Sequence, residues 1–92
     1  MTLDEQEITN AICLHFAQRK QVKPEEVDVQ LMWDEELGFS AEIWVGGRSQ
    51  YLVEANLLEA IERYVLDRYD LRVFRNQIQL TLEDEIQAIV NT

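Results

Sequence analysis

The chain has 92 residues, of which 47% are hydrophobic and 28% are charged, and this composition predicts one globular domain with a single core. Eighteen Asp and Glu against eight Lys and Arg give a formal net charge of −10, which argues against nucleic-acid and anionic-membrane partners. Cys13 is the only cysteine, so no intrachain disulfide can form and a reducing, cytoplasmic setting is expected.

The first half of the chain predicts a helix followed by two strands. Residues 3–20 place apolar side chains at helical spacing, and Thr2 with Glu5 forms a capping-box pattern at the start. After a linker that contains a proline, alternating apolar and polar residues predict strands over 27–34 and 39–45. Antiparallel pairing of these strands keeps their odd-numbered apolar side chains on one buried face.

The glycine pair in the stretch IWVGGRSQY predicts a chain reversal between two strands. A three-residue loop of Gly46, Gly47 and Arg48 keeps the apolar side chains together, for example by pairing Ile43 with Tyr51, whereas a two-residue loop mixes the two faces. The positive φ that such a loop requires explains the glycines. The alternative is that the turn amides and the arginine hold an anion, so these three loop residues are also a candidate anion site.

The second half predicts another helix over residues 54–69 and a strand over 71–80 with a bulge or turn near Asn76. Residues 81–90 predict a short amphipathic helix, because Thr81 and three acids form its first turn. Pattern alone leaves open which strand the fourth strand pairs with.

These elements predict an α+β fold in one domain over residues 1–92. The order is α-β-β-β-α-β-α, and one antiparallel sheet packs against the helices.

The second face of this sheet is more apolar than contact with water explains. Even-numbered positions should be polar there, yet they include Met32, Trp44 and Leu52. Coverage by a helix of the same chain or by a partner explains this equally well, and the simplest partner is a second copy in a two-fold dimer.

A second candidate interaction surface is the only concentration of basic residues in the chain. Two acids within residues 63–75 leave this stretch with a charge of +2, which favours solvated surface over a nucleic-acid footprint. The arginines are equally suited to docking on an acidic surface, including that of another copy. They are Arg63, Arg68, Arg72 and Arg75.

His15 is the only histidine and lies in the middle of the apolar face of the first predicted helix. Burial there suits a base, a ligand or a pH-sensitive group, and the plainer alternative is a hydrogen-bonded imidazole at the edge of the core. Cys13 does not share its face, and no motif surrounds Ser40 or Ser49. The sequence therefore predicts no catalytic residue, no metal site and no cofactor.

Two segments, EIWVGGRSQYL and EAIERYVLDRYDL, carry a resemblance together with the overall length and the acidic helical start. With these features the chain resembles the small uncharacterised bacterial proteins of the YxcD type. The resemblance implies one compact domain and assigns no activity or binding residues. From the residues themselves we expect a non-enzymatic, homodimeric protein–protein interaction module, and the alternative is a small enzyme or ligand-binding domain with a pocket near His15.

Overall fold

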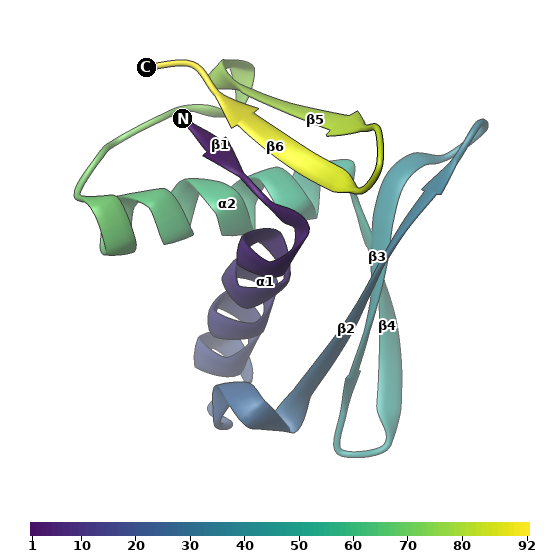
Figure 1. Ribbon diagram of the computed structural model, residues 1–92. Coiled ribbons are helices and arrows are strands. Elements are labelled where there is room, and N and C mark those ends of the chain that lie inside the picture. Colours follow the sequence, from purple (N-terminus) through teal and green to yellow (C-terminus); the bar gives the residue numbers. More distant parts are fainter.

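A computed structural model describes residues 1–92 and confirms the α+β class. Two helices pack against two three-stranded antiparallel sheets, ordered β1-β6-β5 and β2-β3-β4 (Figure 1). The helices are α1 (Glu5–Lys20) and α2 (Glu54–Tyr69). The strands are β1 (Thr2–Leu3), β2 (Val27–Asp34), β3 (Gly38–Val45), β4 (Arg48–Val53), β5 (Ile78–Leu82) and β6 (Ile86–Val90).

The start of α1 differs from the predicted capping box. Asp4 is the N-cap, and its carboxylate accepts a hydrogen bond from the backbone N–H of Glu7 at 2.8 Å. Thr2 and Leu3 form β1 and pair with β6 instead of opening the helix. The strand is favoured because this pairing places the side chain of Leu3 in the core, where it is only 1% exposed.

Helix α2 spans Glu54–Tyr69, as predicted. Its buried face consists of Leu57, Ala60, Ile61, Tyr64 and Val65. Neither helix is long and apolar enough to cross a membrane.

The hairpin of β2 and β3 has the predicted register, with Leu31 opposite Ala41 and Val29 opposite Ile43. The side chains of this inner face contact the two helices and enter the core. Trp33 was expected on the same buried face, but 46% of it is exposed. Trp33 lies opposite Phe39 beside the turn that joins β2 to β3, and this end of the hairpin extends away from both helices (Figure 1).

The connection from β3 to β4 is a two-residue turn, so the predicted three-residue loop is wrong. Gly46 and Gly47 have φ values of 58° and 79°, which are those of the type I′ turn whose twist suits a hairpin. Val45 therefore lies opposite Arg48. This shift of one residue exchanges the two faces of β4.

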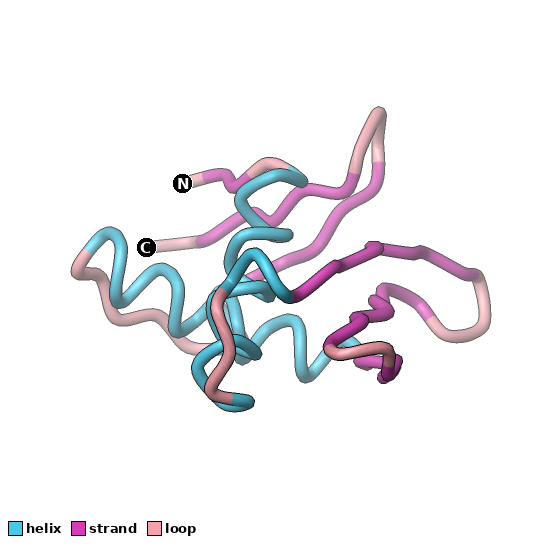
Figure 2. Tube along the Cα trace, turned by 90° about the horizontal axis from the view of Figure 1, so that it is seen from below, coloured by secondary structure: helices cyan, strands magenta, loops and turns pink.

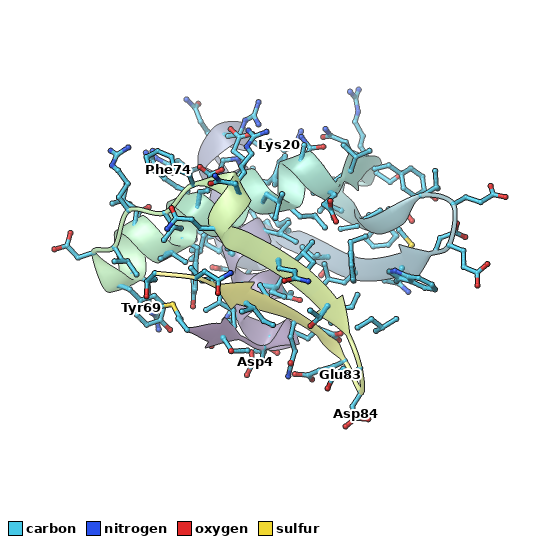
Figure 3. The ribbon with its side chains drawn as sticks, turned by 90° about the horizontal axis from the view of Figure 1, so that it is seen from above. Asp4, Lys20, Tyr69, Phe74, Glu83 and Asp84 are labelled. Carbon is cyan, nitrogen blue, oxygen red and sulfur yellow. The ribbon has the colours of Figure 1, made fainter.

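The predicted C-terminal helix over residues 81–90 is also wrong, because β5 and β6 form a hairpin there. Ile86, Ala88 and Val90 are buried at strand periodicity, and β6 has a partner on each side. The acids expected in a helical first turn instead occupy the tight connection, where Glu83 and Asp84 point away from the body (Figure 3).

The segment before β5 fits the prediction only in part. A short 3₁₀ turn over Arg75–Gln77 confirms the turn near Asn76, but residues 71–74 form no strand. With β1 added and the last helix replaced by β6, the order of helices and strands is β-α-β-β-β-α-β-β.

The two ends of the chain complete the first sheet. The amino terminus donates to the carbonyl of Val90 at 3.1 Å, and the N–H of Val90 donates to the carbonyl of Met1 at 2.7 Å. All 20 buried residues of the core are hydrophobic.

Candidate functional site

The side of β2-β3-β4 that faces away from the helices, called here the outer face, is covered by no element of the chain (Figures 1 and 2). Strand alternation and the register place three cross-strand rows on it. The rows are Met32–Ser40–Val53, Gln30–Glu42–Tyr51 and Asp28–Trp44–Ser49.

The sequence predicted three apolar residues on the second face of the sheet, and two of them lie on the outer face. Met32 and Trp44 are half-buried there, whereas Leu52 lies opposite Ala41 in the core with 1% exposure. The two-residue turn places Tyr51 and Val53 on the outer face instead, and they are 69% and 62% exposed. Sequence reasoning missed these two residues because it assigned the glycine pair to a longer loop, although adjacent glycines are typical of a type I′ turn.

The outer face carries negative charge and no positive charge. Asp28 and Glu42 are its acids, while Gln30 and Tyr51 supply hydrogen-bond donors next to them. The outer face therefore combines exposed apolar side chains with these two carboxylates.

The predicted basic cluster is separate from the outer face, because α2 packs against the inner face of β3 and β4. Arg63 forms an ion pair with Asp67 at 3.6 Å, and Arg75 forms one with Glu62 at 3.2 Å. Arg68 lies in the last turn of α2, and the exposed Arg72 follows in the segment after it. The two predicted interaction surfaces thus lie in separate regions of the fold, and Leu52 belongs to neither.

A hollow of about 470 Å³ lies between α1 and α2 beside His15. We call this hollow the interhelical groove. A smaller hollow of about 220 Å³ shares His15 and Arg63 with it and reaches Arg72. The expectation of a pocket near His15 thus has a matching cavity in the fold.

His15 lacks the hydrogen bond that the plainer alternative expected, because its Nε2 is buried without a partner. Its ring packs edge-on against Phe16 with the ring centroids 5.2 Å apart. Burial lowers the pKa of His15, Glu59 opposes this shift, and Arg19 and Arg63 add to it. The imidazole is therefore neutral at neutral pH.

The glycine turn confirms the predicted chain reversal and leaves the anion site a prediction. Arg48 lines a hollow of about 300 Å³ together with Lys20 from the end of α1. Gly46 and Gly47 do not line this hollow.

No group of three or more His, Cys, Asp or Glu side chains comes together in a way that could hold a metal ion. Cys13 lies 3.4 Å from the carbonyl oxygen of Val27, and burial, with the charge of Asp28, raises the pKa of its thiol. A protonated thiol is a poor nucleophile.

The family described as "Protein of unknown function (DUF2653)" matches residues 1–85, and the chain belongs to this family. The chain is 30% identical over 66 residues to the uncharacterized protein YxcD of Bacillus subtilis (strain 168). The match covers 71% of this chain and 65% of that protein, so the chain spans somewhat less than two thirds of its relative's length. No solved structure matches the chain.

Proposed function

We propose that this family member is a non-enzymatic protein–protein interaction module that forms a homodimer through its outer face. The observation that carries the proposal is the exposure of Tyr51 and Val53 beside Trp44 and Met32, on a sheet face that the chain leaves uncovered. A solvated sheet face is normally polar, and an apolar one is typical of a contact surface.

The arrangement of the rows supports a second copy as the partner. A two-fold axis along β3, in the plane between two facing sheets, places β2 of one copy over β4 of the other. Met32 then lies over Val53 of the second copy, and Gln30 lies over its Tyr51. The pair of Met32 and Val53 is thus apolar on both sides, and Trp44 lies close to the axis.

The same axis places Glu42 near its counterpart, which weakens the contact through like-charge repulsion. Three strands about 4.8 Å apart and six residues of about 3.3 Å rise make a contact of about 15 by 20 Å. This is small for a specific interface, so we expect a dissociation constant on the order of micromolar or weaker.

Sedimentation equilibrium over a wide concentration range tests the proposal. We expect a reversible dimer that Tyr51→Ser weakens at least about tenfold, because Tyr51 is exposed and contributes contact area. The matched control is Phe74→Ser, which removes an aromatic side chain that is 57% exposed away from the outer face. A wild-type chain that stays monomeric at millimolar concentration, or equal loss of the dimer in both variants, contradicts the proposal.

The net charge of −10 supports a protein partner over nucleic acid. The single cysteine supports a cytoplasmic location. Four arginines lie outside the proposed dimer contact, and we propose them as a secondary surface for acidic proteins; they are Arg63, Arg68, Arg72 and Arg75.

Ligand binding beside His15 is a second candidate function, and the interhelical groove is the observation that favours it. It requires neither the outer face nor a second copy, so the two candidates can be tested separately.

A further inference from the structure

The interhelical groove exists because small side chains line it where the helices meet. Ala11 and Ala17 on α1 and Ala60 on α2 leave space that larger residues would fill. Its volume of about 470 Å³ lies within the range of small-molecule sites.

Part of the groove wall is apolar and accessible. Leu14 is 45% exposed on α1, and Val22 and Pro24 extend the apolar wall along the segment that follows this helix. An exposed leucine beside an open hollow provides contact area for a hydrocarbon chain.

The rest of the wall is polar and carries a net positive charge. Arg63 and Arg68 on α2 line the groove with Asp67 as the only acid, which gives +1 in a protein whose total charge is −10. The ion pair of Arg63 with Asp67 spans 3.6 Å between side chains that are 55% and 65% exposed. Such a pair is weak, so Arg63 can turn to an incoming anion.

His15 lies on the same wall with a buried Nε2 that has no hydrogen-bond partner. An unsatisfied buried nitrogen destabilises the free protein, and a turn of the imidazole toward the groove would let a polar ligand atom satisfy it. A neutral imidazole protonated on Nε2 donates to a carboxylate oxygen without bringing a second charge.

From this combination of walls we propose that the interhelical groove binds a small amphipathic carboxylate. The aliphatic chain lies along Leu14 and Val22, and the carboxylate binds between the guanidinium groups of Arg63 and Arg68, within reach of the His15 ring. Arginine is suited to this role because its planar donors match the two oxygens of a carboxylate.

NMR titration with octanoate tests the site, because the imidazole of the only histidine gives a single, assigned signal. We expect saturable shifts of His15 and of the methyl groups of Leu14 and Val22. Acetate has the same head without the chain, and octan-1-ol has the chain without the charge. We expect each of them to bind at least about tenfold more weakly than octanoate, because each lacks one of the two contacts.

Two arginines provide a matched pair of variants. Arg63 and Arg75 have similarly exposed side chains, at 55% and 54%, and each has one ion pair, but only Arg63 lines the groove. We expect Arg63→Gln to weaken octanoate at least about fivefold and Arg75→Gln to leave it unchanged, because only Arg63 reaches the carboxylate. Leu14→Ser removes an exposed methyl-bearing side chain without touching the core, and it should also weaken the octanoate complex.

Equal affinity for octanoate and octan-1-ol, equal loss in Arg63→Gln and Arg75→Gln, or no saturation at millimolar octanoate overturns the inference. The titration is repeated on Tyr51→Ser, in which the outer face is disabled. Unchanged octanoate affinity there supports the groove as an independent site, and lost affinity overturns it.

Discussion

The two sheets of this protein have equal strand numbers and the same antiparallel pairing, but their second faces differ. In β1-β6-β5 the residues that alternate with the buried ones are Thr2, Gln79, Thr81, Gln87 and Ile89, of which only one is apolar. In β2-β3-β4 four of the nine residues in the three rows of the outer face are large apolar or aromatic side chains, namely Trp44, Tyr51, Val53 and Met32. The helices cover one face of each sheet, so these side chains of β2-β3-β4 stay uncovered within the chain, and this supports the proposed dimer contact.

The largest expected effect on stability tests whether Leu52 or Tyr51 is the β4 residue that faces the core. Leu52→Ala should lower the free energy of unfolding by about 2–5 kcal/mol, because it opens a cavity in the core. Tyr51→Ser on the monomer should cost less than about 1 kcal/mol, since the ring is exposed. Urea unfolding measures both variants at a concentration where dimers are absent. A larger loss of stability in Tyr51→Ser than in Leu52→Ala would favour the three-residue loop and would place Tyr51 in the core instead of on the outer face.

The next effect concerns the turn that sets this register. Gly47 has φ 79° and open space around its Cβ position, so Gly47→Ala should cost about 1–2 kcal/mol through backbone strain alone. The β5–β6 connection contains no residue with positive φ, and Asp84→Ala should stay within about 0.5 kcal/mol of the wild type. Thermal unfolding of both variants measures the two changes in stability. A similar loss of stability in Gly47→Ala and Asp84→Ala would contradict the prediction that only the glycine turn is strained by the substitution.

Removal of a charge from the outer face is expected to have a smaller effect, and this effect is a gain in dimer affinity. Glu42→Gln should tighten the dimer about fivefold, because two carboxylates near the axis repel by about 1 kcal/mol in water. Glu83→Gln removes an acid from the β5–β6 turn, outside the proposed contact, and controls for the change in net charge. Sedimentation equilibrium compares the two variants, and an equal gain in both points to long-range charge rather than to this contact.

The smallest expected effect is the contribution of His15 on α1 to the pH dependence of stability. Its pKa lies below the usual 6.5 in the folded chain, chiefly through burial. The unfolded chain therefore takes up the proton first, and stability is lost as the pH falls below about 6.5. The charged groups around the ring are Arg19 on α1 and Glu59, Glu62, Arg63 and Arg72 from α2 and the segment after it.

We expect His15→Gln to flatten the dependence of unfolding free energy on pH between about 5 and 7. NMR titration of the imidazole gives the pKa directly. A folded value at or above 6.5, or an unchanged pH dependence in the variant, contradicts the prediction.

The sequence was sufficient where one local pattern had one solution. Helix α2 and the β2–β3 register followed from periodicity alone, because over eight to sixteen residues a single arrangement brings most of the apolar side chains onto one face. His15 was recognised as a candidate, but that its Nε2 is buried without a hydrogen-bond partner became evident only from the structure.

The error over residues 81–90 arose because two periods fit the same short segment. Ile86, Ile89 and Val90 suit one face of a helix, while Ile86, Ala88 and Val90 suit one face of a strand. Pairing of β6 with both β1 and β5 decides between them, and those partners lie at opposite ends of the chain.

The amino-acid sequence by itself determined the α+β class, the two helices, the chain reversal at the glycines and the presence of excess apolar surface, since these depend on neighbours a few residues apart. Only the tertiary structure decided that Leu52 is buried and Tyr51 exposed, that residues 81–90 contribute to a hairpin, and that the interhelical groove lies beside His15. The physical reason is that a face becomes buried only when another element lies against it, and the positions of the helices and sheets follow from packing across the whole chain.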